Sequence, residues 1–341
     1  MNTLLPLCSS IVSFVFAALV FDQWRQRRQS FQLAWTVGLL FYGVSAGTEF
    51  IGSAFGWSEP LYRAWYLVGA FYVAAYLGLG TIYLLAKTAF GYFAGVTVVL
   101  GGLLSLAFTR VYPGSGTVGG IAFAVAALGG LAIILATALR REWVPHLALA
   151  VLVVGSLAAA YLVLGAPLAA PSWALDPHTH VPVGSAFPGS VRVLTGPFNI
   201  AGALCLTFGA AFSAYVYMPK RKLLAVGMVQ APVLAQAWYF VAVVVNFFAS
   251  LPGAVRSLFA GRLNSRVPAT ILIALGGFIP GVTSGLNRFG ITWSFFLGEL
   301  LGVLLIFAGF LVSEEVFANL RLPARGVVWR RDRPGKAEVA G

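Results

Sequence analysis

The apolar residues of this chain fall into long runs that short polar stretches separate. A hydrocarbon core about 30 Å thick needs about 20 apolar residues in one helix, and most of the runs come close to this length. Helices of this kind are apolar around their whole circumference, as expected inside a bilayer. The pattern therefore predicts an all-α, multi-pass membrane protein with about nine transmembrane helices. The runs cover residues 3–23, 32–54, 62–86, 90–109, 117–139, 146–165, 197–218, 268–286 and 291–313.

The composition leaves no room for a sizeable soluble domain, because 60% of the residues are hydrophobic, 9% are charged and the mean hydropathy is +0.89. Any function therefore lies in or beside the lipid bilayer. The net charge of +12 falls in short loops between apolar runs, where cations orient a membrane protein, so nucleic-acid binding is not expected. Cys8 and Cys205 each lie inside an apolar run and are interpreted as packing residues.

Lysine and arginine are distributed unevenly between the two sides that the predicted helices define. With the N-terminus outside, four of the 22 cations fall on the outer side, and the other eighteen fall on the cytoplasmic side. Because positively charged loops stay in the cytoplasm, we expect an N-out, C-in protein of the cell (inner) membrane. The four outer cations are Arg63, Arg110, Arg192 and Arg288.

The stretch 223–265 fits neither a loop nor a simple span. Basic residues flank it at 220–222 and at 256–266, so it is predicted to begin and end in the cytoplasm. Its most apolar part, 238–251, is short for a span, which favours an interfacial or re-entrant helix. A tenth span that violates the charge rule is the alternative.

These assignments divide the chain into four parts. A seven-helix transmembrane bundle is followed by the cytoplasmic-side interfacial or re-entrant segment and then by a transmembrane helical hairpin. A basic cytoplasmic tail follows, which is expected to be unstructured or to lie on anionic lipid. In this order the four parts are residues 1–219, 220–266, 267–316 and 317–341.

Two acidic residues lie within the predicted spans, Glu49 and Glu299, both in the outer half. A carboxylate that faces lipid is costly, so both side chains are expected to face the interior of the bundle. One interpretation is that they bind a ligand or a proton. The other is that each pairs with an outer arginine, Glu49 with Arg63 or Arg110 and Glu299 with Arg288.

Four of the aromatic residues in the third run stand at spacings of seven, four and seven, namely Trp65, Tyr72, Tyr76 and Tyr83. These spacings place all four on one face of a regular helix. Such a stripe can pack between helices, or it can line a pocket for a flat or lipidic ligand.

Several kinds of chemistry lack support in the sequence. A retinal Schiff base needs a lysine at membrane depth and an intramembrane haem needs facing histidines, and neither pattern is present, so no cofactor is predicted. Asp176, His178 and His180 in the loop 166–196 have the right ligand types for a metal, but they are a weak candidate site and no metal is predicted. The sequence also lacks the phosphate-binding loop of an ATP-driven transporter.

Three classes of function remain. We favour a protein that binds or transports a small or amphiphilic ligand through an outward-facing pocket. The alternatives are a non-catalytic sensor or structural subunit of a membrane complex, and a membrane-embedded lipid-modifying enzyme. One His-x-His loop falls short of a catalytic constellation, which favours a function other than catalysis. The predicted ligand-binding residues are Glu49, Glu299, Tyr72, Tyr76, Trp65, Arg63 and Arg288.

Overall fold

The computed structural model describes residues 2–225, 232–260, 263–264, 266–312, 319–322 and 326–330. Most of the described chain is helical. The helices are α1 (Leu4–Arg27), α2 (Ser30–Phe55), α3 (Glu59–Leu67), the π-helix η1 (Val68–Tyr72), α4 (Val73–Leu84), α5 (Phe90–Phe108), α6 (Gly116–Leu139), η2 (Arg141–Trp143), α7 (Val144–Gly165), η3 (Gly184–Ala186), α8 (Gly189–Arg192), the π-helix η4 (Gly196–Ile200), α9 (Ala201–Tyr217), α10 (Pro232–Phe259), α11 (Arg266–Arg288) and α12 (Phe295–Val312).

Within the described residues, nine helical stretches are long and apolar enough to cross a membrane, as expected for a multi-pass membrane protein. Eight of them coincide with predicted runs, and the ninth is Val241–Phe259 within α10. The predicted run 32–54 does form a helix, α2, but α2 is not among the nine. Its buried positions include Gln32, Thr36 and Glu49, and α2 packs against α1, α3 and α4. Polar side chains are tolerated there because other helices, and not lipid, surround them.

Several helices begin or end at residues whose backbone preferences suit a helix end. Arg28 ends α1 in the left-handed conformation, with φ 53°, and its backbone N–H donates to the carbonyl oxygen of Trp24. Gly56 ends α2 with φ 99°, a conformation that glycine adopts without strain. Pro60 and Pro145 stand in the first turns of α3 and α7, where a missing backbone N–H costs nothing.

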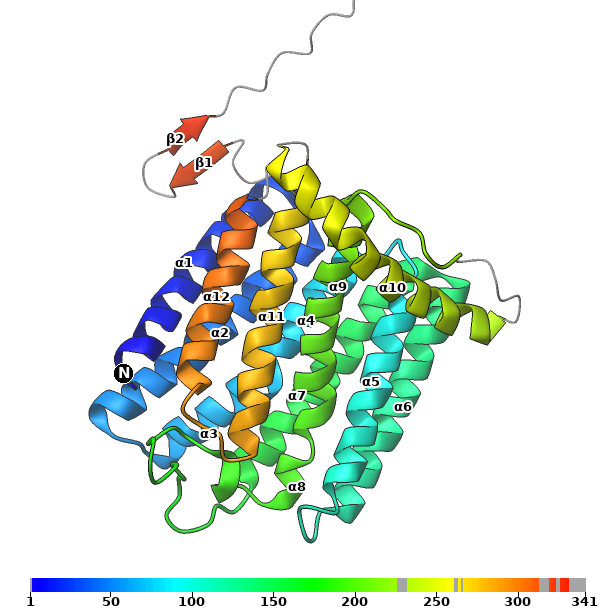
Figure 1. The fold of residues 1–341 in the computed structure, drawn as a ribbon. Coiled ribbons are helices and arrows are strands. Elements are labelled where there is room, and N and C mark those ends of the chain that lie inside the picture. Colours follow the sequence, from blue (N-terminus) through cyan, green and yellow to red (C-terminus); the bar gives the residue numbers. More distant parts are fainter. Residues whose placement is uncertain are drawn as a thin grey trace, which may run out of the picture. The chain divides into compact units, whose positions relative to one another are not determined.

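The chain divides into two compact units, each described here by itself. The first comprises residues 1–210 and 274–305, and the second comprises residues 211–273 and 306–341. In the first unit the long helices run side by side, and the short helices α3 and α8 lie with connecting loops at one end (Figure 1). We call this end of the first unit the loop end.

The second unit contains α10 and one feature that the sequence did not predict. Part of the predicted tail forms a short antiparallel hairpin, with β1 (Asn319–Leu322) paired to β2 (Gly326–Arg330). Asn319 pairs with Arg330 and Leu322 with Gly326. The described chain is therefore all-α except for this hairpin.

Two helices of the first unit approach each other backbone to backbone at a pair of glycines. A Cβ atom added to Gly202 of α9 would lie 2.3 Å from the carbonyl oxygen of Ala74 on α4. A Cβ atom on Gly78 of α4 would lie 2.6 Å from the carbonyl oxygen of Gly202. Such close approach increases the van der Waals contact between two helices. This contact matters inside a bilayer, because apolar side chains gain nothing there by moving from lipid into the protein.

Gly202→Ala is expected to destabilise the protein by about 3 kcal/mol, because backbone atoms cannot move aside as a flexible side chain can. The unfolding midpoint of the detergent-solubilised protein measures this loss. Gly285→Ala is the matched control, since a Cβ atom at helical Gly285 would meet nothing within 4 Å. Equal midpoints for the two variants would contradict the close approach of α4 and α9.

Candidate functional site

The two acids of the predicted spans meet inside the first unit, although 250 positions separate them in the sequence. Glu49 lies on α2 about 9 Å along the helix from its end at Phe55, and Glu299 lies on α12 about 6 Å from its start at Phe295. Glu49 has 0% of its surface exposed. The two carboxyl groups lie within hydrogen-bonding contact of each other. The prediction that both acids face the interior agrees with this arrangement.

Each carboxyl group of the pair has a buried oxygen without a hydrogen-bond partner among the described residues, and a proton would supply one. Oε2 of Glu49 and Oε2 of Glu299 are both buried and find no hydrogen-bond donor in the described protein. Two ionised carboxylates in contact repel each other, and burial away from water strengthens this repulsion. If one carboxyl group is protonated, it can donate a hydrogen bond to the other, and the repulsion is removed. The geometry therefore favours one shared proton.

Two aromatic residues hold the pair in place. The indole Nε1–H of Trp65 on α3 donates to Oε1 of Glu49 at 2.7 Å. The hydroxyl of Tyr42 donates to the backbone carbonyl oxygen of Glu299, also at 2.7 Å, and so joins α2 to α12. Trp65 was predicted as a site residue, whereas Tyr42 was not. Tyr42 lies seven positions before Glu49, two turns away on the same face of α2, and this spacing could have identified Tyr42 as a site residue.

Trp65 does not continue the tyrosine stripe that the spacing predicted. Between Trp65 and Tyr76 the helix contains the π-helical turn Val68–Tyr72, which holds about one residue more than an α-helical turn. One extra residue rotates the positions on its two sides by about 100° relative to each other. Trp65 therefore turns to Glu49, and the expectation of one shared face does not hold for this residue.

The tyrosines of the stripe lie against α7 and α2. The hydroxyl of Tyr72 donates to the backbone carbonyl oxygen of Ser156 at 2.9 Å, and that of Tyr76 lies 3.5 Å from the Ser156 hydroxyl. Both rings contact Phe41, each with ring centroids 5.1 Å apart. These contacts are interhelical packing with hydrogen bonds, and a ligand-binding role for Tyr72 and Tyr76 stays a prediction.

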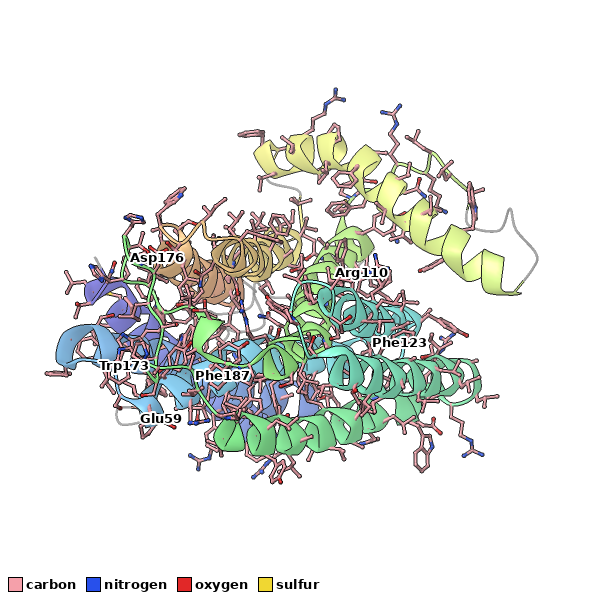
Figure 2. All side chains as sticks on the ribbon, turned by 90° about the horizontal axis from the view of Figure 1, so that it is seen from below. Glu59, Arg110, Phe123, Trp173, Asp176 and Phe187 are labelled. Atoms are coloured by element: carbon pink, nitrogen blue, oxygen red, sulfur yellow. The ribbon has the colours of Figure 1, made fainter. Side chains whose placement is uncertain are left out.

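The loop 166–196 covers the site at the loop end. Phe187 stacks on Tyr62 and Tyr66 with ring centroids 5.3 Å and 4.3 Å apart, and the Tyr62 hydroxyl donates to the carbonyl oxygen of Val183. Trp65 belongs to the same buried cluster. Viewed from the loop end, Phe187 lies over the region of α3 (Figure 2). The described conformation is thus closed over Trp65 on this side, and an outward-opening pocket stays a prediction.

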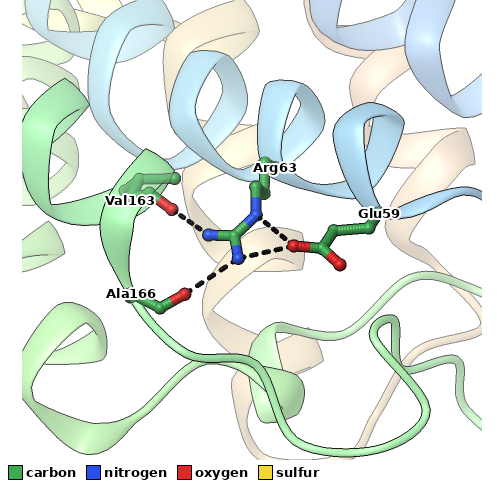
Figure 3. A network of polar contacts seen from close by, with 4 residues as sticks. All are labelled: Glu59, Arg63, Val163 and Ala166. Atoms are coloured by element: carbon green, nitrogen blue, oxygen red, sulfur yellow. Dashed lines mark hydrogen bonds and ion pairs between the residues drawn. The ribbon is translucent and has the colours of Figure 1, made fainter.

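Arg63 does not pair with Glu49. Its Nε and Nη2 groups donate to Oε1 of Glu59 at 2.9 Å and 2.7 Å. Nη1 donates to the carbonyl oxygen of Val163 at 2.5 Å, and Nη2 donates to that of Ala166 at 2.8 Å (Figure 3). A cation at the carboxyl end of a helix is favourable, so Arg63 fastens α3 to the end of α7.

The other two arginines that were predicted as partners of the acids are Arg110 and Arg288. Arg110 is exposed in the turn after α5. The side chain of Arg288 lies outside the described residues, so the predicted pairing with Glu299 stays a prediction. Among the side chains that the structure describes, no lysine or arginine forms an ion pair with Glu49 or Glu299.

The carboxylate of Asp176 closes a turn. Its Oδ1 accepts from the backbone N–H groups of His178 and Thr179, at 3.1 Å and 2.8 Å, and from the Thr179 hydroxyl at 2.8 Å. The backbone hydrogen bond from Thr179 is the main cause that lowers the pKa of Asp176 below its ordinary value. This turn is fastened to the loop before α12, because the hydroxyls of Thr179 and Thr292 lie 2.6 Å apart.

No group of three or more histidine, cysteine, aspartate or glutamate side chains that could hold a metal occurs in the described part of the chain. Asp176 and His178 take part in the turn, and His180 has a left-handed backbone with φ 56°. The interpretation as a lipid-modifying enzyme relied on these three residues, and it stays a prediction.

Comparison of the chain with known protein families, with curated proteins and with solved structures finds no match.

Proposed function

We propose that this multi-pass membrane protein binds or transports a small or amphiphilic ligand, and that the Glu49–Glu299 pair carries a proton coupled to that step. The single observation that carries the proposal is the contact between two buried carboxyl groups, each with an oxygen that has no hydrogen-bond partner among the described protein atoms. Apolar residues of similar volume would hold α2 and α12 together at lower cost. Ionisable groups inside a bilayer are typical of proton and ion pathways.

The pair also supplies a two-state element. With the proton present, Glu49 and Glu299 attract each other. When the proton leaves, the two carboxylates repel, and the force between α2 and α12 changes sign. Binding of a ligand that favours one of these two states would then change the affinity of the pair for the proton, and binding of the proton would change the affinity for the ligand.

Two π-helical turns and a closed aromatic cluster in the first unit support a role in conformational change. The π-helical turn Val68–Tyr72 follows directly after α3, which carries Trp65, and a second π-helical turn, Gly196–Ile200, begins α9. Single π turns inside longer helices occur often at functional sites. The closed cluster around Phe187 is the part that has to move for a ligand to reach Glu49 from the loop end.

Proton movement in reconstituted vesicles tests the proposal. Purified protein is placed in vesicles that contain a pH-sensitive dye, and a pH gradient is imposed across the membrane. We expect the internal pH to change faster than in empty vesicles, and we expect Glu49→Gln and Glu299→Gln to remove this difference. Glu142→Gln is the matched control, because Glu142 is exposed in η2. Wild-type rates equal to those of empty vesicles would exclude proton transport, and unchanged rates in both site variants would exclude this pair.

A further inference from the structure

The segment that follows α9 is bound along α10 by side chains of that helix. We call residues 219–225 the strap. Oδ1 of Asn246 accepts from the backbone N–H groups of Leu223 and Leu224, at 2.7 Å and 3.0 Å, and its Nδ2 donates to the carbonyl oxygen of Leu224 at 2.9 Å. The Ser250 hydroxyl accepts from the backbone N–H of Arg221 at 2.9 Å. All of these residues belong to the second unit.

These bonds place the strap antiparallel to α10. The earlier strap residue, Arg221, meets the later helix residue, Ser250, and Ala225 meets Trp238, whose indole N–H donates to the Ala225 carbonyl at 2.9 Å. Asn246 and Ser250 both have 0% exposed surface. Since the strap is not helical, its backbone groups need such partners, and buried amide and hydroxyl groups supply them.

The α10 helix has two unlike faces. The buried face carries small and polar residues at a spacing of four, namely Ala242, Asn246, Ser250 and Ala254. The opposite face is apolar and exposed. Its residues include Val241, Phe248, Val255 and Phe259, with exposures of 46%, 63%, 51% and 87%.

The charges of this region all have the same sign. Residues 211–273 contain six lysines and arginines and no aspartate or glutamate. Lys220, Arg221 and Lys222 of the strap and Arg256 of α10 are exposed. A positively charged surface beside an exposed apolar helix face is typical of helices that lie on anionic lipid.

We propose that α10 lies in the plane of the membrane, with the face of Phe248 and Phe259 among the acyl chains and the strap cations on anionic lipid headgroups. The strap decides against a transmembrane α10. It is bonded to Asn246 and Ser250, near the middle of the stretch Val241–Phe259 that is long and apolar enough to cross. A spanning α10 would carry the three cations of the non-helical strap into the hydrocarbon, which membrane proteins avoid.

Depth measurements along α10 separate the two arrangements. Cys8→Ser with Cys205→Ala removes the native thiols, and single cysteines then replace Val241, Phe248 or Phe259 in the full-length protein. Each is labelled with a small fluorophore in phosphatidylcholine–phosphatidylglycerol vesicles, and quenching is compared between lipids that carry a spin label near the headgroup and lipids that carry it deep in the acyl chain. Leu128→Cys, exposed in the middle of α6, is the control for a deep position.

An in-plane α10 places all three labels at the same shallow depth, whereas Leu128 is quenched most strongly by the deep spin label. A spanning α10 separates positions 241 and 259 by about 27 Å along the membrane normal. Depths that differ in this way would overturn the proposal. Labels that neither lipid quenches would also overturn it, because the apolar face would then lie outside the bilayer.

A second measurement tests the headgroup contact. The label at Phe248 is quenched by spin-labelled phosphatidylglycerol or by spin-labelled phosphatidylcholine in vesicles of equal parts of the two lipids. We expect the anionic lipid to quench more, and we expect the combined Lys220→Gln, Arg221→Gln and Lys222→Gln variant to lose this preference, with about a fivefold loss for each cation. Arg140→Gln with Arg141→Gln is the control. A preference that the strap variant retains would overturn the assignment of the cations to headgroups.

Discussion

Glu299→Gln should abolish the fall in thermal stability that we expect the wild-type protein to show as the pH rises. The shared proton holds Glu49 and Glu299 together, so its stabilising effect is fully present only below about pH 4.3, where glutamates of the unfolded chain are protonated as well, and it decreases as the pH rises until the folded pair releases the proton. Two carboxylates about 4 Å apart then repel each other by about 4 kcal/mol at an effective dielectric constant of about 20. A glutamine amide donates to Glu49 at every pH, so the variant keeps the contact.

Unfolding midpoints of the detergent-solubilised protein, measured across a pH series, test this expectation. Glu49→Gln should behave as Glu299→Gln does, because either change removes one of the two charges. Glu142→Gln should retain the wild-type pH dependence, since Glu142 is an exposed glutamate in η2. A wild-type midpoint that does not fall as the pH rises above about 4.3, or a fall that persists in both site variants, would show that no shared proton stabilises the pair.

Arg63→Ala should destabilise the protein by about 3 kcal/mol, since hydrogen bonds from a charged donor each contribute about 1.5–3 kcal/mol and are not additive. The Arg63 side chain is 13% exposed and joins Glu59 on α3 to the carbonyl oxygens of Val163 and Ala166 at the end of α7 (Figure 3). Its removal leaves those carbonyl groups without this donor. Because Glu59 is 46% exposed, water replaces the lost ion pair at that side chain.

Chemical or thermal unfolding of the purified protein measures this loss. Arg63→Lys should recover only part of it, because a lysine ammonium cannot reproduce the planar fork of N–H groups. Arg110→Ala is the control, as Arg110 is an exposed arginine of the same loop end (Figure 2). If Arg63→Ala and Arg110→Ala cost the same, Arg63 does not fasten α3 to α7.

Most of the helices could be predicted from the sequence, because a bilayer requires nearly continuous apolar runs and the loops between them are short. The run 32–54 shows the limit of this rule. It forms α2, but Gln32, Thr36 and Glu49 lower its hydropathy, and these three side chains are buried against other helices instead of facing lipid. The hairpin of β1 and β2 was not predicted, because short pairings depend weakly on the hydrophobic pattern.

The site could be predicted in part for the same physical reason. Charge at membrane depth is costly, and this fact alone identified Glu49 and Glu299. That the two carboxyl groups meet depends on how α2 and α12 pack, which periodicity does not specify. The π-helical turn at Val68–Tyr72 has no signal in the spacing of the aromatic residues, and it turned Trp65 toward Glu49 instead of toward the tyrosines.

Infrared spectroscopy of the carboxyl C=O stretch tests most directly whether the Glu49–Glu299 pair holds a proton. A protonated carboxyl group absorbs apart from ionised carboxylates, and the reconstituted protein can be measured at neutral pH in ordinary and heavy water. We predict a protonated-carboxyl band that exchanges slowly, because the site is buried, and that disappears in Glu49→Gln and in Glu299→Gln but persists in Glu142→Gln. Absence of the band at neutral pH, or its persistence in both site variants, would contradict the shared proton.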